Sequence, residues 1–282
     1  MAENTVKKIA TRESYGNSLK ELAEEFPNLV VLDADLAAAT KTGIFRKAYP
    51  DRHIDCGIAE ENMMGVAAGL SLVGKIPFVS SFAMFAAGRA FEQVRNSIGY
   101  PHLNVKIGAT HAGITVGEDG ATHQCNEDIA LMRTIPGMVV MCPSDDVEAR
   151  AAVRAALEYE GPVYIRFGRA AVPVINDHPG YHFEIGKGTV VREGKDVTIV
   201  ATGICVDSAL GAAKMLEEEG ISAEVVNICT IKPLDEEIIL NSAKKTGKVV
   251  TVEEHSVIGG LGSAVAEVLA GRSGAKFARV GI

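Results

Sequence analysis

The sequence predicts a two-domain α/β protein in which each domain has a parallel sheet covered by helices on both faces. Short, continuous apolar runs alternate with helix-like segments along the 282 residues, and this pattern is typical of parallel strands buried on both faces. A segment rich in Pro, Gly and His at residues 171–188 interrupts the alternation, which then restarts. We therefore expect a first domain over residues 1–170, a linker over 171–188 and a smaller second domain over 189–282.

The first domain is expected to contain six strands. Helices are expected from about Glu60 to Val73 and near Gly88–Ile98, and a third helix after Pro143, with Ser144 as its N-cap. The six strands are expected at Leu29–Leu32, His53–Cys56, Ile76–Ser81, Val105–Thr110, Met138–Cys142 and Val163–Phe167.

The second domain repeats the alternation. Its strands are expected at Val197–Ala201, Ala223–Asn227 and Lys248–Glu253, and its helices at Val206–Glu219, Leu234–Lys245 and Leu261–Leu269. The glycine cluster Gly259–Gly262 precedes the last helix, where capping or tight packing is the expected role. The sequence stops at Ile282, within or just after an expected strand, so we expect a chain shortened at this end.

Composition excludes several classes of function. The net charge of −8 argues against a nucleic-acid partner, which normally requires a basic face. The sequence contains no apolar run near the roughly 18 residues of a membrane helix, and its N-terminus lacks the apolar core of a signal peptide. The five cysteines are widely spaced and form no CxxC pair, which favours reduced thiols and a cytoplasmic location.

A glycine-rich loop from His111 to His123 follows the fourth expected strand and contains Asp119. Open α/β sheets bind ligands at the carboxyl ends of their strands. The two histidines and the aspartate suit the orientation of hydroxyl groups or proton transfer near neutral pH. A polar turn with surface histidines remains the alternative. The loop completes no metal-ligand pattern, so we expect no metal site in this chain.

Three further sets of residues suggest a functional site at the carboxyl edge of the predicted first sheet. Glu60 is expected to begin a helix of small residues in apolar surroundings, where loss of hydration favours a protonated carboxyl that can donate or share a proton. The alternative is an ordinary acid of the first helical turn, favoured there by the helix dipole. Phe82 and Phe85 end the third strand and could form a slot for a flat ring, although ordinary core packing is the alternative. Anionic substrates bind well to guanidinium groups, and the candidates are Arg12, Arg166 and Arg169.

Taken in order, these motifs resemble the C-terminal half of transketolase. They are GIAEENMMGVAAGL with Glu60, SSFAMF with Phe82 and Phe85, and ATHAGITVGEDGATHQ. The resemblance covers nearly the whole chain and implies a pyrimidine-binding domain followed by a transketolase C-terminal domain. It also implies thiamine diphosphate as cofactor and transfer of a two-carbon ketol unit between sugar phosphates.

The resemblance implies a role for each matched residue. Glu60 matches the glutamate that bonds to N1′ of the cofactor's aminopyrimidine and so activates its thiazolium carbon. The other expected cofactor contacts are Phe85, which stacks on the pyrimidine, with Phe82, Ile58 and Asp35 nearby. His111, His123 and Asp119 match groups around the reacting sugar, and both histidines are expected to be catalytic. Arg12 and Arg169 match arginines that hold the substrate phosphate.

Two positions and one motif depart from the family pattern. A phosphate-contacting serine is replaced by Ala39, and an aromatic residue beyond Phe85 by Gly88. The chain also lacks the GDG motif that, with a later Asn, binds Mg²⁺ and the diphosphate. We therefore expect a partner chain, the N-terminal transketolase subunit, to hold Mg²⁺ and share the cofactor. Self-association of this chain is expected to give an α2β2 enzyme.

Other classes fit the sequence less well. A 2-oxo acid dehydrogenase beta subunit shares the fold and the glutamate but is disfavoured by GEDGATHQ, and a 1-deoxy-D-xylulose-5-phosphate synthase has similar motifs. A non-catalytic scaffold is disfavoured because Glu60, His111, Asp119 and His123 are all present. An NAD-dependent dehydrogenase is disfavoured because no GxGxxG follows the first strand.

Overall fold

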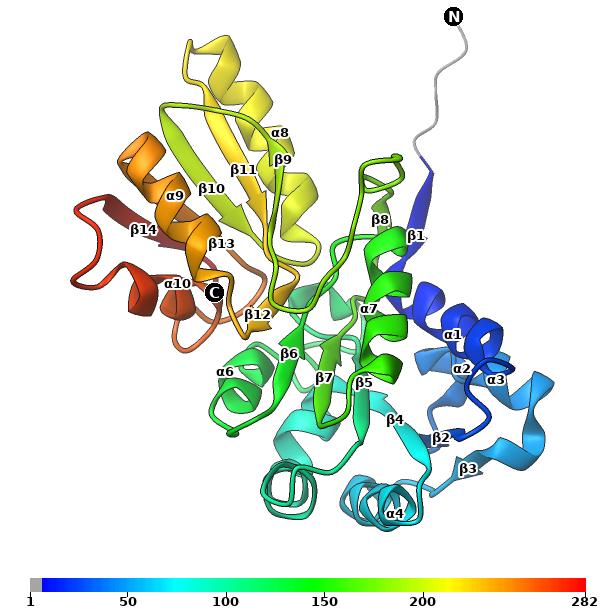
Figure 1. Cartoon of the computed structure of the whole chain (residues 1–282). Coiled ribbons are helices and arrows are strands. Elements are labelled where there is room, and N and C mark those ends of the chain that lie inside the picture. Colours follow the sequence, from blue (N-terminus) through cyan, green and yellow to red (C-terminus); the bar gives the residue numbers. More distant parts are fainter. Residues whose placement is uncertain (1–6) are drawn as a thin grey trace, which may run out of the picture.

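The computed structural model describes residues 7–282 and confirms the predicted α/β class, with a seven-stranded and a five-stranded sheet in two lobes (Figure 1). The first sheet has seven strands in the order β12-β6-β7-β5-β4-β2-β3. All its neighbouring pairs are parallel except β12 with β6. The strands are β2 (Leu29–Asp33), β3 (His53–Asp55), β4 (Ile76–Phe82), β5 (Lys106–Thr110), β6 (Val139–Met141), β7 (Val163–Arg166) and β12 (Thr230–Lys232).

Helices cover both faces of this sheet, which explains why its strands are continuously apolar. In β2, Leu29 and Val31 pack with α1 (Thr11–Leu22) and α7 (Asp146–Glu158). The alternate residues Val30 and Leu32 pack toward the opposite layer. That layer contains α4 (Glu60–Leu72), η2 (Met84–Arg89), α5 (Phe91–Gln93), η3 (Val94–Gly99) and α6 (Asp128–Arg133). The remaining short helices are α2 (Ala37–Thr40), α3 (Gly43–Ala48), η1 (Pro50–Arg52) and η4 (Ile114–Val116).

The second sheet has five strands in the order β14-β13-β10-β11-β9, with only β9 antiparallel to its neighbour. One face packs on α8 (Cys205–Glu218), and the other on α9 (Glu236–Thr246) and α10 (Leu261–Leu269). The strands are β9 (Thr189–Arg192), β10 (Val197–Ala201), β11 (Ala223–Asn227), β13 (Lys248–Val252) and β14 (Lys276–Val280).

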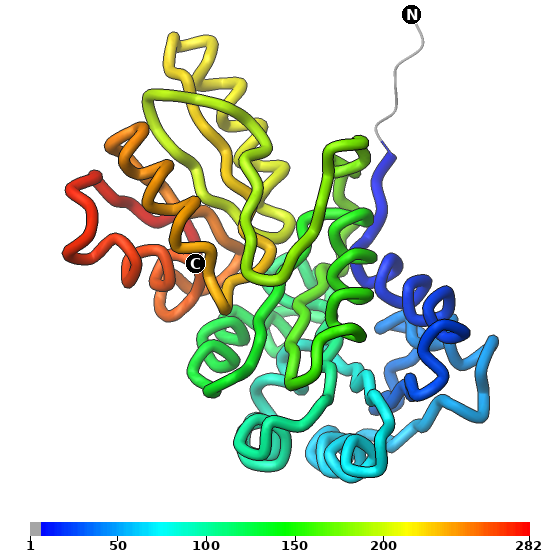
Figure 2. The backbone as a smooth tube through the Cα atoms, in the orientation of Figure 1, coloured from blue at the N-terminus to red at the C-terminus, as the bar shows by residue number. Residues whose placement is uncertain are grey.

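The two lobes share structure that the sequence pattern did not reveal. β12 comes from the second half of the chain but pairs with β6 at the edge of the first sheet. Within the expected linker, β8 (Ala171–Pro173) pairs antiparallel with β1 (Lys8–Ala10). Figure 2 follows the chain from the first lobe through this segment into the second. The two halves are therefore joined by strand pairing as well as by the connecting segment.

Two local expectations were wrong. The N-cap of α7 is Asp145, whose Oδ1 accepts a hydrogen bond from the Glu148 amide at 2.9 Å. Ser144 instead donates its hydroxyl to the Glu148 carboxylate at 2.7 Å. The helix expected near Gly88–Ile98 begins at Met84 and contains two π-helical stretches, η2 and η3. This earlier start matters for the site, because it places Phe85 on the helix.

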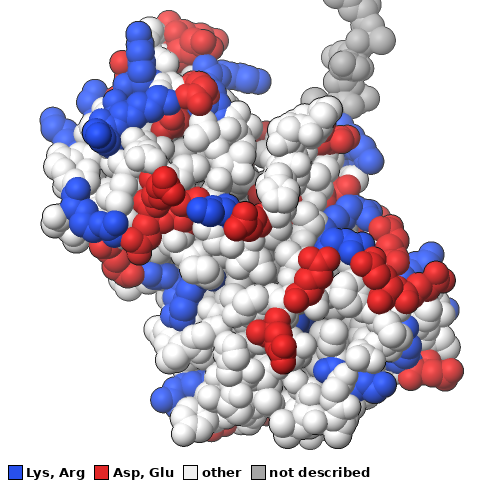
Figure 3. Space-filling model, viewed as in Figure 1, with Lys and Arg blue, Asp and Glu red and all other residues white. Residues whose placement is uncertain are grey.

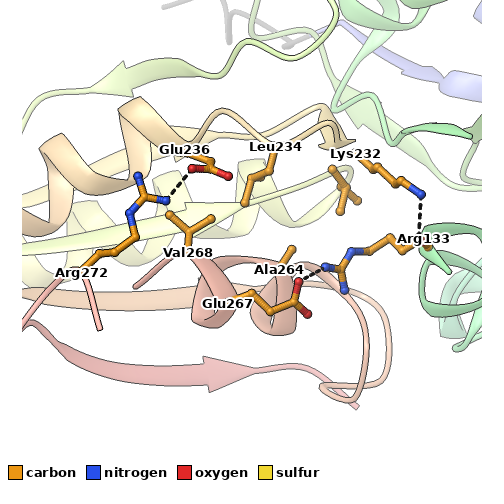
Figure 4. A pocket seen from close by; sticks show the side chains of 9 residues that line it. Arg133, Lys232, Leu234, Glu236, Ala264, Glu267, Val268 and Arg272 are labelled. Carbon is orange, nitrogen blue, oxygen red and sulfur yellow. Dashed lines mark hydrogen bonds and ion pairs between the residues drawn. The ribbon is translucent and has the colours of Figure 1, made fainter. Parts of the chain in front are cut away.

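Polar contacts also join the lobes where β12, α6, α9 and α10 meet (Figure 4). Lys232 donates to the carbonyl oxygens of Arg133 and Ile135, and Arg133 pairs with Glu267 at 2.7 Å. These groups line a hollow of about 360 Å³ that contains none of the expected site residues. Because its cations already have partners, we treat it as a polar domain contact.

The surface view in Figure 3 shows basic and acidic side chains interspersed over both lobes of one face. Within residues 7–282, no helix combines the length and hydropathy needed to cross a membrane.

Candidate active site

The expected site residues converge at the carboxyl edge of the first sheet. Phe82 ends β4 opposite Thr110 at the end of β5, so the next residue, His111, lies beside Phe82. The two rings stack with their centroids 3.9 Å apart. Strand register therefore brings the aromatic segment and the glycine-rich loop together, as their positions after neighbouring parallel strands require.

His111 is buried and held in one orientation. Its φ of 60° lies in the left-handed region, which is uncommon for a residue other than glycine. The ring Nε2 lies 3.1 Å from Arg12 Nη1, and Nδ1 lies 2.8 Å from the Thr110 hydroxyl. Because a guanidinium can only donate, Nε2 accepts and Nδ1 carries the proton. Burial and the nearby Arg12 charge lower the pKa of His111 to about 4, so the ring is neutral at pH 7.

Phe85 and His123 complete a cluster of rings. The Phe85 and His123 centroids are 5.3 Å apart with the rings nearly perpendicular. Phe82 lies 6.0 Å from Phe85, with their rings nearly parallel. The structure thus brings together four of the residues singled out in the sequence.

Glu60 begins α4, and its side chain is only 2% exposed. Its carboxylate accepts hydrogen bonds from Arg89 Nη1 at 2.9 Å and, more weakly, from the Ser81 hydroxyl at 3.4 Å. The Arg89 guanidinium also lies over the Phe85 ring, with Cζ 4.6 Å from its centroid. A flat group that bears nitrogen therefore lies over the Phe85 ring and within hydrogen-bond distance of Glu60, and an aminopyrimidine would fit the same place with one proton shared between its ring nitrogen and the Glu60 carboxyl group. The residues present fit that ring.

Arg89 was missed in the sequence because the helix was expected to begin at Gly88. Residues four apart on a helix share a face, so placing the start at Met84 would have paired Phe85 with Arg89. At Gly88, where the sequence departs from the family pattern, a Cβ would meet only the flexible end of the Met84 side chain, so local packing does not require glycine there.

Two arginines lie near the histidine loop. Arg12 Nη1 donates to the Ala39 carbonyl oxygen at 2.8 Å, and within residues 7–282 its buried Nε has no hydrogen-bond partner. Arg169 pairs with the exposed Glu118 at 2.9 Å. Burial and the Arg169 charge lower the pKa of Arg12, while the Asp119 charge opposes this shift. The group has the charge and the open donors to bind an anion.

Arg166 does not join this group, so its candidacy as an anion-binding residue was wrong. It is buried and forms an ion pair with Asp128, with Nε 2.9 Å from Oδ2. Its Nη2 donates to the carbonyl oxygens of Cys125 and Glu254. All of these contacts are internal, because Arg166, the last residue of β7, is buried within the protein.

Ile58 and Asp35 lie at the same edge of the sheet but apart from the ring contacts described above. Ile58 is 77% exposed two residues before Glu60. Asp35 is also exposed, with a φ of 59°, and its amide donates to Asp55 Oδ1 at 3.1 Å. Among residues 7–282, no cluster of three or more His, Cys, Asp or Glu side chains has an arrangement suited to a metal ion.

Fold and site together define a class of α/β proteins, in which a parallel-sheet domain carries a buried glutamate beside a cluster of aromatic rings and a second α/β domain packs against it. Residues 7–174 match the family model described as transketolase, pyrimidine binding domain, and residues 186–282 match transketolase, C-terminal domain. The chain belongs to the transketolase family.

Several relatives are similar to nearly the whole chain. A protein of Methanocaldococcus jannaschii named as a transketolase C-terminal section is 55% identical, covering 96% of this chain and 85% of its own length. A 6-deoxy-6-sulfo-D-fructose transketolase subunit of Clostridium sp. (strain MSTE9) is 49% identical, and the match covers 96% of this chain and 84% of that subunit. A solved structure described as a split gene transketolase, inactive beta4 tetramer, has a TM-score of 0.91 at 60% identity. The match covers 98% of this chain and 90% of the chain in that structure. Human transketolase is 38% identical, but the match covers only 43% of its length.

Proposed function

We propose that this chain is the C-terminal subunit of a split, thiamine diphosphate-dependent transketolase that moves a two-carbon ketol unit between sugar phosphates. The observation that carries the proposal is Glu60, whose buried carboxylate holds a flat N–H donor against Phe85 beside the histidine loop. The family match and the similarity to split transketolases support the same conclusion. They do not favour the dehydrogenase-like or synthase-like alternative.

The roles of the site residues are those that the family resemblance implies, and the contacts of Glu60 and Phe85 support them. Glu60 would bond to N1′ of the aminopyrimidine and Phe85 would stack on the ring, with Phe82, Ile58 and Asp35 around it. When bound, the cofactor supplies the carbon that accepts the ketol unit. The chain's own part is to orient the ring through Glu60 and to exclude water with the cluster of aromatic rings.

The histidine loop and the arginines face the sugar. His111 is neutral at pH 7 with Nδ1 donating to Thr110, so its Nε2 is suited to accept a hydrogen bond from a sugar hydroxyl in place of the one from Arg12. His123 and Asp119 act on the remaining hydroxyls. Arg12 and Arg169 hold the phosphate, which the unpartnered Nε of Arg12 supports.

The rest of the enzyme comes from other chains. We place Mg²⁺ and the diphosphate on an N-terminal partner subunit, and we assign an α2β2 assembly in which this chain associates with itself. Residues 1–170 and 189–282 are the two domains, joined by 171–188. All five cysteines are free, which supports a cytoplasmic location.

A mixing experiment tests this proposal. The chain with cofactor and Mg²⁺ should transfer no ketol unit, and activity should appear when the N-terminal subunit is added. Glu60→Gln should fold normally, as judged by circular dichroism, yet lower kcat by at least about a hundredfold because the proton relay is lost. Full activity of the chain alone would contradict the split arrangement, and near-normal turnover of Glu60→Gln would contradict the role of Glu60.

A further inference from the structure

A segment of the second lobe, Glu253–Ser256, lies against the base of the histidine loop. Glu254 Oε1 accepts a hydrogen bond from the Thr115 amide at 2.6 Å, and the Ser256 amide donates to the Asn126 carbonyl oxygen at 2.8 Å. Thr115 precedes Asp119 and His123, and Asn126 follows them. The segment therefore contacts the chain both before and after the part of the loop that carries Asp119 and His123, the groups proposed to face the sugar.

Glu254 is held firmly in this place. The residue is 8% exposed, and its carbonyl oxygen accepts from Arg166 Nη2 at 2.8 Å. The same nitrogen donates to the Cys125 carbonyl oxygen at 3.2 Å, so one guanidinium ties Glu254 to the far arm of the loop. Arg166 is itself fixed by its buried pair with Asp128. The anchor is thus part of a buried network and does not depend on a flexible surface side chain.

The loop is shaped to admit the Glu254 carboxylate. Gly113 has a φ of +80°, and any Cβ at this position would overlap the Glu254 carboxyl group. Gly113 also donates to the Cys125 carbonyl oxygen at 2.9 Å, which closes the neck of the loop beside the anchor. Gly113 lies only two positions after His111, so a shift of Gly113 would carry over to His111.

We propose that Glu254 is a positioning residue that sets the place of the loop from His111 to His123 through the Thr115 amide. The second lobe then takes part in substrate recognition without touching the substrate. This inference rests on the proposed function, because the loop is assigned to the sugar there. It extends that function by giving the C-terminal domain a role beyond assembly.

Hydrogen exchange of the full chain tests the anchor without any activity measurement. Glu254→Ala should speed exchange in peptides spanning residues 112–124 by about tenfold or more, because a hydrogen bond to a charged group is lost. Glu254→Gln retains an acceptor oxygen and should give an intermediate rate. Glu217→Ala is the matched control, since Glu217 is an exposed carboxylate of the same lobe and its ion pair with Arg192 lies within that lobe. Equal loop exchange in Glu254→Ala and in this control would overturn the proposal.

Kinetics of the complex with the N-terminal subunit separates positioning from stability. Glu254→Ala should lower kcat/KM for the sugar phosphate about ten- to a hundredfold, mainly through a higher KM. The Kd for thiamine diphosphate should change less than about threefold, and Glu254→Gln should restore most of the loss. A parallel loss of cofactor binding, or no rescue by Gln, would indicate a merely structural role. If the unmodified complex transfers no ketol unit, the proposed function fails instead, and the exchange result still decides the anchor.

Discussion

On the proposed function, replacing Arg89 should strengthen cofactor binding, because Arg89 occupies the places on Glu60 and Phe85 that the proposal assigns to the aminopyrimidine ring. Its Nη1 lies 2.9 Å from Glu60 Oε2, and its Cζ lies 4.6 Å from the Phe85 ring centroid. The ring cannot bind to Glu60 and Phe85 until Arg89 moves away. The affinity measured for the cofactor therefore includes the free energy of breaking these contacts.

The size of that cost follows from exposure. A shielded hydrogen bond to a charged group contributes about 1.5–3 kcal/mol, while an exposed ion pair contributes about 0–1 kcal/mol. The Arg89 side chain is 44% exposed and that of Glu60 2%. We therefore expect an intermediate value of about 1–2 kcal/mol for the ion pair and the contact with Phe85 together. Arg89→Ala should tighten cofactor binding about five- to thirtyfold.

Titration calorimetry is the direct assay, with thiamine diphosphate and Mg²⁺ titrated into this chain mixed with its N-terminal subunit. Arg95→Ala is the matched control, because Arg95 is an exposed arginine of the same helical layer and contacts Asn96 rather than Glu60. Both variants lose one positive charge, so the comparison isolates the contact. An Arg89→Ala affinity equal to that of the control, or weaker than that of the unmodified protein, would refute the reasoning.

Two further predictions concern buried groups. Asp128→Asn should lower the free energy of unfolding in chemical denaturation by about 3–5 kcal/mol, because it leaves the buried Arg166 without its ion pair. The control is Glu25→Gln, which removes the exposed ion pair with Arg154 and should lower the free energy of unfolding by less than about 1 kcal/mol. Equal losses in the two variants would contradict the prediction. The folded-state pKa of His111 is about 4 and its ordinary value is 6.5, so the unfolded chain binds a proton first as the pH falls. Stability should therefore decrease from about pH 6.5 toward 4, by up to about 1.4 kcal/mol per pH unit from this group. His111→Gln should flatten that slope in denaturation curves at several pH values, and an unchanged slope would argue against a neutral, buried His111.

The sequence predicted the strands of the first sheet well, because burial on both faces makes them continuously apolar. β2 illustrates this, with Leu29 and Val31 in one core cluster and Val30 and Leu32 in the other. β12 could not be assigned in this way. Its three residues from Thr230 to Lys232 carry no periodic signal, and the sheet to which they pair depends on how the two lobes dock.

The same distinction applies to the site. The contact of Phe82 with His111 follows from two adjacent parallel strands, so the sequence order was enough to expect it. Arg166 and Arg169 looked equivalent in the sequence, yet one is buried against Asp128 and the other reaches the loop. The periodicity of apolar residues does not predict whether a long side chain at the end of a strand will be buried in the protein or reach toward the loop. Arg89 and Glu254 were missed for a similar reason, since their roles depend on a helix start and on domain docking.

Two arginines of the site are already paired with carboxylates, and the difference between these pairs has a consequence for binding order. Arg169 pairs with Glu118, whose side chain is 85% exposed, so a substrate phosphate can replace that partner at little cost. Arg89 pairs with Glu60, whose side chain is only 2% exposed, so this pair opens only when another hydrogen-bonding partner reaches the buried carboxyl group. In the proposed site the pyrimidine ring is that partner, because its ring nitrogen shares a proton with Glu60, whereas a sugar phosphate is attracted to the guanidinium and not to Glu60. The charge pattern therefore favours loading of the cofactor before the sugar, with Arg89 returning to Glu60 whenever the ring leaves.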